Sequence, residues 1–195
     1  MEKSKKCKNG ITVYHYPQPA AHSFYISLFV KMGSMYEEER LSGISHFIEH
    51  AVIRNVNAQM GGTLYPLLDK YGLEFNASTF AEMVQFYISG SPRAFRVAAE
   101  ILARVLLPIA LTAQDFEAER SRIRAEIREA QEKTSLLQFT LDNVFGEGAL
   151  ARPITGTGGS VSRISRRALE EHRRAAFTPE NTFVYLTGTY NDGDV

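Results

Sequence analysis

The sequence lacks several features that define particular classes of protein. It contains one cysteine, Cys7, among 195 residues, which excludes an internal disulfide framework and favours a reducing, cytoplasmic compartment. Its 22 basic residues equal its 22 acidic ones, so it has no net positive charge with which to bind nucleic acid. A secretory signal peptide has an apolar segment after its basic start, and no such segment follows the basic N-terminus here. The most apolar stretch, residues 98–111, is charged and too short to cross a bilayer. We therefore expect neither a nucleic-acid nor a membrane partner.

The remaining composition is that of an ordinary folded domain. Apolar residues make up 44% of the chain and charged residues 23%, and both fractions are usual for globular proteins. A chain of this length typically forms one domain and buries roughly 70% of its extended-state surface. We therefore expect residues 1–195 to form a single domain whose core needs neither a disulfide nor a metal.

Hydrophobic periodicity predicts an α+β fold. Strands are predicted at 11–16, 22–31, 73–79, 83–89 and 182–187. Helices are predicted at 42–53, 58–71, 93–106, 113–133, 136–145 and 165–174, with Ser42 as the N-cap of the first and a glycine-rich loop at 146–159. Because strands and helices do not alternate strictly, we expect a layered mixed or antiparallel sheet that is packed by helices.

An H-x-x-E-H motif, formed by His46, Glu49 and His50, lies on the helix predicted at 42–53. Residues four apart are about one helical turn apart, so both imidazoles project from one face and can share a metal ion. Glu49 lies beside them and is free to act as a base. The alternative is a pair of helix histidines that are partly exposed or hydrogen-bonded in the core. The apolar neighbours of the motif favour the metal site over a casual surface cluster.

A carboxylate stripe on the helix predicted at 113–133 offers a further ligand. A catalytic zinc usually takes three protein ligands and leaves a fourth position open. Five residues recur there at steps of three and four: Phe116, Glu119, Ile123, Glu126 and Ala130. A carboxylate on a core-facing stripe is costly unless a metal or a histidine pairs with it. The many charges around this stripe would alone favour an exposed, solvated helix. With the two-histidine motif present, we favour a metal-ligand role for a carboxylate of the stripe.

Four segments together resemble one known family of peptidases. They are SGISHFIEH (42–50), NASTFAEMVQFY (76–87), PITGTGGSVSRIS (153–165) and FTPENTFVYLTG (177–188). The chain resembles the N-terminal, metal-bearing domain of the pitrilysin–insulysin–mitochondrial processing peptidase family, which consists of zinc peptidases with an inverted motif. The resemblance covers nearly the whole chain and implies the single-domain fold of that family.

The resemblance also implies roles for individual residues. His46, His50 and Glu126 would bind Zn²⁺, because Glu126 lies at the family's separation from His50 for the third ligand. Glu49 would take the proton of the attacking water and pass it to the leaving amine. Glu119 matches a glutamate that in the family contacts the metal ligands without binding the metal. There it would orient a ligand histidine or hold the general base in place.

A strand that binds substrate is implied by the resemblance of residues 76–87 to the family's Asn-Ala-x-Thr segment. Asn76, Ala77 and Thr79 would bind an extended peptide by strand addition. From spacing alone the same segment is more simply an ordinary hairpin strand. Val84 stands where family members usually carry threonine, a departure that bears on substrate fit more than on zinc chemistry.

A second domain of similar fold follows this one in family members and contributes an arginine and a tyrosine that orient substrate. No residues of the sequence correspond to it. We therefore expect a partner chain to supply it, in a hetero-oligomer rather than a homo-oligomer, because a second copy of this domain lacks the same groups.

Three functions remain open. The first is a zinc endopeptidase domain or subunit that cleaves peptides. The second is a non-catalytic peptide-binding or scaffold subunit of a peptidase complex, although such members typically lose motif residues that are intact here. The third, a small-molecule metallohydrolase, is disfavoured by the length of the match to peptidase segments.

Overall fold

A six-stranded mixed sheet forms one layer of the computed structural model, which describes residues 3–131, 135–146 and 148–191. The strands are β1 (Lys3–Lys6), β2 (Thr12–Pro17), β3 (Phe24–Val30), β4 (Glu74–Thr79), β5 (Val84–Gly90) and β6 (Thr182–Gly188). Their order is β1-β2-β6-β3-β5-β4. β2 and β6 run parallel, and the other neighbours are antiparallel. The prediction of a mixed α+β layer fold is confirmed.

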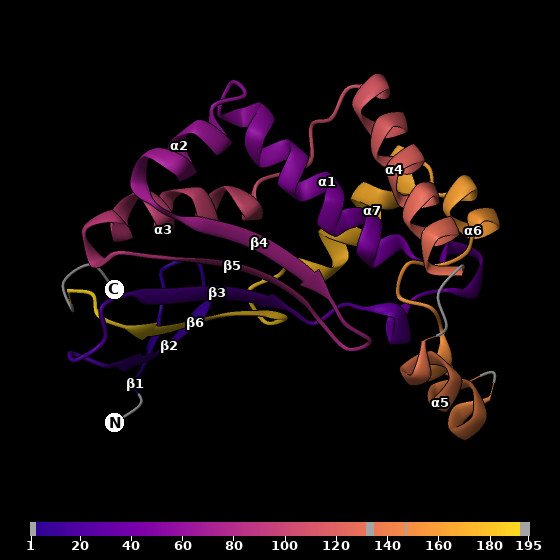
Figure 1. Cartoon of the computed structure of the whole chain (residues 1–195), viewed down its shortest axis with the longest axis horizontal. Helices are drawn as coiled ribbons and strands as arrows, with labels where there is room; N and C mark the ends of the chain where they lie inside the picture. The colour runs from indigo at the N-terminus through magenta and orange to yellow at the C-terminus, as the bar shows by residue number, and fades with distance from the viewer. Residues whose placement is uncertain (1–2, 132–134, 147, 192–195) are drawn as a thin grey trace.

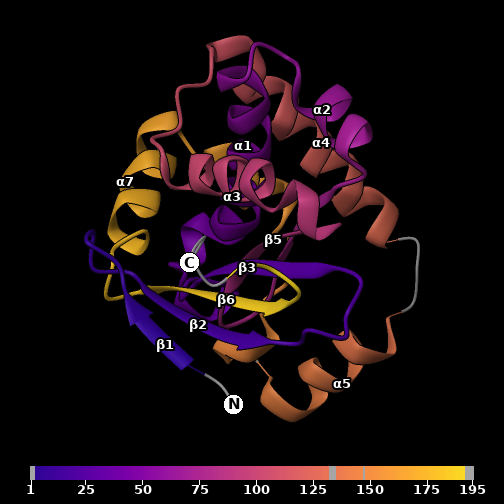
Figure 2. The ribbon, with the colours of Figure 1, turned by 90° about the vertical axis from the view of Figure 1, so that its left-hand side faces the viewer.

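Most of the helices cover one face of this sheet (Figures 1 and 2). The α-helices are α1 (Ile44–Gln59), α2 (Leu64–Tyr71), α3 (Phe95–Ala103), α4 (Ala113–Gln131), α5 (Leu136–Phe145), α6 (Gly158–Arg163) and α7 (Arg166–Ala176). Helix α1 lies near the middle of the layer, where it contacts β4, α4 and α7. Helix α5 lies apart from this layer, beyond the opposite face of the sheet (Figure 1).

The core lies between the sheet and the helices. Alternate residues of β3 and β5 face it, and Leu28, Val30, Phe86 and Ile88 are buried, as the period of two in a strand requires. The opposite face carries partly exposed aromatic rings, among which Tyr25 stacks on Tyr87 with ring centroids 5.3 Å apart. The helices among the described residues therefore leave this aromatic face of the sheet largely uncovered.

Helix α1 is longer than predicted, and its start is capped differently. The expected helix at 42–53 continues to Gln59, so the helix expected at 58–71 begins only at Leu64. The break comes at Gly61 and Gly62, both of which have positive φ. The predicted N-cap, Ser42, is wrong because Gly43 occupies that position and makes no side-chain cap.

Two short elements were not predicted. The lysine-rich N-terminus forms β1, an edge strand whose charged side chains disfavour pairing with another chain. At the end of the expected glycine-rich loop, Thr157 and Ser160 form a capping box that begins α6. The end of the helix predicted at 113–133 lies outside the described residues. No helix among those described is long and apolar enough to cross a membrane.

Candidate metal centre

The start of α1 is fixed by a buried carboxylate. Glu37 accepts hydrogen bonds from the backbone N–H of Gly43 at 2.7 Å and of Ser45 at 2.8 Å. These donors would otherwise be unsatisfied at the first turn of the helix, and a negative charge there is favoured by the helix dipole. The backbone carbonyl of Glu37 in turn accepts from Arg152. Glu37 thus anchors α1 just before His46.

Packing of α4 on α1 brings the carboxylate stripe to the motif. The rings of Phe47 and Phe116 stack with centroids 4.8 Å apart, and Ile123 is fully buried. Because residues at steps of three and four share a helix face, Glu119 and Glu126 lie on the side of α4 that faces α1. The structure therefore places both predicted carboxylates opposite the two histidines.

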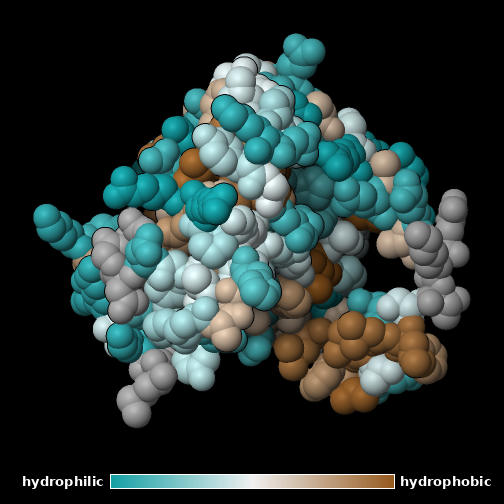
Figure 3. Space-filling model, turned by 60° about the vertical axis from the view of Figure 1, so that its left-hand side comes forward, coloured by the Kyte–Doolittle hydropathy of each residue, from teal (hydrophilic) through white to brown (hydrophobic). Residues whose placement is uncertain are grey.

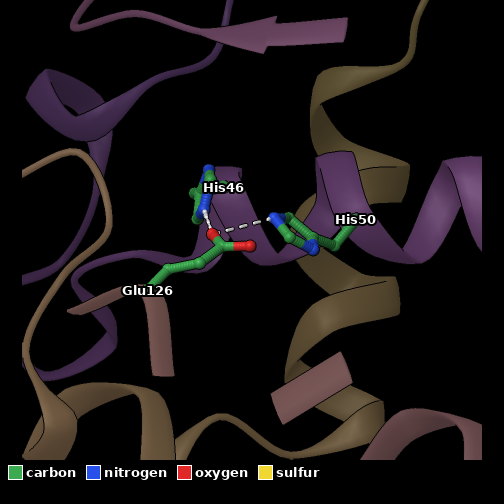
Figure 4. Close-up of side chains that lie close together, drawn as sticks. All are labelled: His46, His50 and Glu126. Carbon is green, nitrogen blue, oxygen red and sulfur yellow. Dashed lines mark hydrogen bonds and ion pairs between the residues drawn. The ribbon is translucent and has the colours of Figure 1, made fainter. Parts of the chain in front are cut away.

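Three potential ligand atoms converge between these helices (Figure 4). Glu126 Oε2 lies 3.2 Å from His46 Nε2 and 3.4 Å from His50 Nε2. Ligand atoms from these three residues lie within 4.8 Å of one another. Two ligand atoms bound to one tetrahedral zinc are about 3.3 Å apart, given metal–ligand distances of about 2.05 Å. The donor set of two imidazoles and one carboxylate fits a zinc ion with an open fourth position.

The second ring nitrogen of His50 has its own partner. His50 Nδ1 lies 3.1 Å from Glu119 Oε2, and Glu119 is only 3% exposed. The other oxygen, Oε1, accepts from Arg54 Nε at 2.5 Å. Metal-bound histidines generally donate their second N–H to a carboxylate in this way, which fixes the ring. Glu119 is thus placed to orient His50, one of the two placements that the resemblance allowed.

Glu49 lies buried between the motif and β4. Its Oε2 accepts a hydrogen bond of 2.5 Å from the hydroxyl of Thr79 and lies 3.7 Å from His46 Nδ1. Thr79 was predicted to bind substrate through its strand backbone, and its side chain also contacts the predicted base. Glu49 is therefore held on the β4 side of the two histidines.

The electrostatics of the site favour a cation. Burial lowers the pKa of His46, but hydrogen bonds and charge from Glu126 and Glu49 outweigh burial and raise this pKa to about 9. Burial raises the pKa of Glu49 and of Glu119, but histidine and other partners outweigh it in both, so each pKa lies below its usual value. The pKa of Glu126 is also lowered, mainly by its hydrogen bond to His46. Three ionised carboxylates thus surround the imidazoles.

A cavity of about 620 Å³ opens from these side chains toward α2 and β4. Tyr65, Phe75 and Asn76 line its far side. In the described sheet β4 pairs on one side with β5 and is the outermost strand. Asn76 is exposed at this edge, whereas Ala77 is buried against the core. The edge beside the cavity is thus a place where an extended chain could add a strand.

Sequence reasoning missed two residues that contact this site, Arg54 and Asp115. Arg54 Nη1 donates to Asp115 Oδ1 at 2.8 Å, beside its bond to Glu119. A signal existed, because Arg54 follows His50 by four residues and Asp115 precedes Glu119 by four. Each therefore shares a helix face with a predicted site residue.

Comparison with known proteins places the chain among peptidases. The model of the family described as Insulinase (Peptidase family M16) matches residues 12–158. An uncharacterised zinc protease of Rickettsia bellii is 27% identical over 192 residues, which cover 97% of this chain and 47% of that protein. The chain spans less than half the length of the curated relatives it matches.

Solved structures show the same fold. A protease from Helicobacter pylori superposes with a TM-score of 0.87 at 22% identity, over 100% of this chain and 48% of that one. An inactive M16 peptidase domain from Pseudomonas fluorescens superposes with a TM-score of 0.84 at 16% identity, over 100% of this chain and 48% of that one. With the family match over most of its length, the chain belongs to the insulinase, or pitrilysin-type, peptidase family.

Proposed function

We propose that the chain is a zinc-dependent endopeptidase domain or subunit that hydrolyses peptide bonds. The observation that carries this proposal is the convergence of His46, His50 and Glu126 at one point, with Glu49 buried beside them. The names of the zinc protease relatives support the same metal. Bound zinc would supply a Lewis acid that activates water and polarises the scissile carbonyl.

Glu49 is the proposed general base. Its carboxylate is ionised at neutral pH because its pKa lies below the ordinary value, so it can accept a proton from the attacking water and later give it to the leaving amine. The Thr79 hydroxyl at 2.5 Å holds one of its oxygens in place. Glu119 keeps the His50 ring oriented, with Nε2 left for the metal.

An extended peptide is the proposed substrate. The outer edge of β4 offers backbone groups for strand addition next to the cavity, and the backbone of Asn76, Ala77 and Thr79 would contribute to this pairing. Strand addition depends on the peptide backbone more than on side chains, so we expect modest sequence specificity. The side chain of Thr79 has a second proposed role, because its hydroxyl holds Glu49.

A partner of similar size is proposed to complete the enzyme. Residues 1–195 are proposed to act as a single domain, and the matched relatives carry about as much chain again or more. Helix α5 exposes five large apolar side chains, and these form the apolar patch of Figure 3: Leu136, Leu137, Phe139, Val144 and Phe145. By contrast, Gln138 of the same helix is half-buried, and its side chain donates a hydrogen bond to the backbone carbonyl of Ala151. A helix with its apolar side outward is suited to a protein partner.

This partner is proposed to be a different chain or domain, because a second copy of this domain would present the same proposed zinc site and not the substrate-orienting groups that the resemblance implies. A cytoplasmic location stays a prediction that depends on the cysteine count.

A non-catalytic scaffold role is the second candidate. It is favoured by the solved Pseudomonas fluorescens domain, which is described as inactive. The complete set of His46, Glu49, His50 and Glu126 argues against that role here, since a scaffold has no use for a base beside a metal site.

Metal analysis tests the proposal directly. We expect about one zinc per chain in the purified protein. His46→Ala and Glu126→Gln should each abolish stoichiometric zinc, whereas Arg167→Gln, on the exposed face of α7, should not. Full zinc retention in His46→Ala would contradict the ligand assignment. Stoichiometric zinc without peptide cleavage, even with a partner present, would favour the scaffold.

A further inference from the structure

The guanidinium of Arg54 bridges two carboxylates of α4. Arg54 lies one turn beyond His50 on α1 and reaches across to Glu119 through Nε, at 2.5 Å, and to Asp115 through Nη1, at 2.8 Å. Asp115 and Glu119 are four residues apart and therefore share one face of α4. Asp115 is itself held by the hydroxyl of Thr112 at 2.6 Å. One planar side chain thus ties α1 to α4 immediately behind the proposed metal centre.

Each oxygen of Glu119 has a different partner. Oε1 accepts from Arg54, and Oε2 faces His50 Nδ1 at 3.1 Å. The side chain of Glu119 is only 4% exposed, whereas that of Arg54 is 36% exposed. Arg54 and Glu119 both line the cavity, but a water that took the place of the guanidinium would bring no positive charge. Without Arg54 the carboxylate would lose a charged donor and be freer to turn its plane.

The plane of Glu119 determines the direction of the His50 ring. A histidine that donates from Nδ1 to a fixed acceptor presents Nε2 along a fixed line. In His50 that line leads to the point where Glu126 and His46 also converge. A rotation of Glu119 toward solvent would therefore move the Nε2 donor out of the geometry that a tetrahedral metal requires.

We propose that Arg54, held by Asp115, is a positioning residue that raises the affinity of the chain for zinc by fixing Glu119 behind His50. The inference rests on the proposed function, since it assumes the same three ligands. Lysine cannot replace this arginine fully, because an ammonium group is a point charge and lacks the planar fork that engages two carboxylates at once.

The experiment is a zinc titration of the full chain against a competing chelator. Loss of an outer partner of a metal ligand typically lowers affinity 10- to 100-fold. We expect Arg54→Gln to raise the zinc Kd by about that factor and Arg54→Lys by a smaller factor. Arg167→Gln is the matched control, because Arg167 donates to Glu171 in an exposed pair on α7; its Kd should stay within about twofold of wild type.

A double-variant cycle shows whether Arg54 acts through Glu119. Glu119→Gln alone should weaken zinc binding, and adding Arg54→Gln to it should change the Kd by less than about twofold. Substitution of Co²⁺ for zinc gives a second readout, since a displaced His50 changes the visible absorption of the bound ion. Thermal unfolding of each zinc-free variant shows that it is folded.

The outcomes separate this inference from the proposed function. An unchanged Kd in folded Arg54→Gln, or full additivity with Glu119→Gln, overturns the positioning role even if the chain is an active peptidase. If Arg54→Gln does not fold, Arg54→Lys and Asp115→Asn decide by the same criterion. Weaker zinc binding in the Arg54 variants supports the inference even if the wild-type chain cleaves no peptide with a partner present, an outcome that would refute the proposed function alone. A wild-type chain that binds no zinc refutes both.

Discussion

Glu49 is held from two sides by groups of different character. The Thr79 hydroxyl donates to one of its oxygens, and the imidazole of His46 lies 3.7 Å from the same oxygen. These contacts keep an ionised carboxylate at a buried position, where a carboxylate alone would be costly. The proposed base is therefore positioned before any substrate arrives.

Replacement of this base separates metal binding from chemistry. We expect Glu49→Gln to retain about one zinc per chain, because none of the proposed ligands is changed. The amide cannot accept the proton, so peptide cleavage should fall by at least about 10²-fold. Metal content and cleavage of a fluorogenic peptide are measured on the same preparation. Cleavage at near wild-type rates would mean that another group is the base.

Thr79 gives a second prediction at this scale. Thr79→Val removes the hydroxyl but keeps the shape, and we expect kcat to fall about tenfold, since a hydrogen bond to a charged group contributes about 1.5–3 kcal/mol. Thr79→Ser keeps the donor and should retain most of the activity. A rise in KM at unchanged kcat would instead return Thr79 to the substrate-binding role that the sequence suggested.

The sequence could predict side chains that share a helix face, but it could not predict contacts between elements. The spacing of His46 and His50, and of Glu119 and Glu126, follows from the helical repeat alone. The pairing of Arg54 with Glu119 depends on how α1 and α4 are rotated against each other, which the packing of Phe47 on Phe116 decides. The role of each residue at the centre stays a prediction.

At the scale of elements, the start of α1 depends on two close backbone approaches. Gly43 has a φ of 90°, and a Cβ there would lie 2.5 Å from the carbonyl oxygen of Thr155. Gly156, with a φ of 70°, approaches the Ser42 carbonyl in the same way. The loop before α6 is thereby clamped against the beginning of α1.

A pair of glycine substitutions tests this clamp. Gly43→Ala should lower the free energy of unfolding by about 2–5 kcal/mol, because the left-handed conformation and the steric contact both oppose a methyl group. Gly61→Ala has a comparable φ of 62° but nothing within 4 Å of the new atom, so we expect a loss of about 1 kcal/mol. Urea denaturation compares the two. Equal losses would mean that the contact with Thr155 is unimportant.

Helix and strand positions were largely predictable, and so was the cap of α4, where Thr112 accepts from the backbone N–H of Asp115 at 3.0 Å, whereas the cap of α1 was not. The alternation in β3 and the stripe on α4 are visible in the sequence because burial imposes their periods. The predicted cap at Ser42 was wrong because the acceptor comes from Glu37, six residues before Gly43, through a fold of the loop that no local pattern reveals. Likewise, β1 forms because β2 is present as a neighbour, not because a lysine-rich segment favours a strand.

At the scale of the whole molecule, the apolar outer side of α5 bears on the proposed partner. Thirteen large hydrophobic side chains are exposed among the described residues, and five of them lie on this helix. Such a concentration on ten residues is typical of an interaction surface rather than of a solvated helix.

We therefore expect the isolated chain to cleave peptides feebly and to gain activity with a partner that supplies a second domain. A zinc site at an open sheet edge would be accessible to bulk water. This access weakens both the positioning of substrate and the stabilisation of the charge that develops in the transition state. Cleavage is measured across a concentration series of the chain alone and with the partner. Robust activity that is proportional to monomer and unaffected by dilution would contradict this expectation. Leu137→Glu with Phe139→Glu should reduce the gain from the partner without changing zinc content.

The position of β6 in the sheet has a consequence for how the chain is made. β6 lies between β2 and β3, and it pairs residues 182–188 with strands from the first 30 residues of the sequence. During synthesis the ribosome therefore releases both histidines and all three glutamates of the centre long before the middle of the sheet can close. Contacts this distant along the chain form slowly, and the sheet whose strands β4 and β5 contact α1 stays open between β2 and β3 until β6 arrives. A nascent chain that stops short of residue 182 should consequently bind zinc poorly, although every proposed ligand is already present.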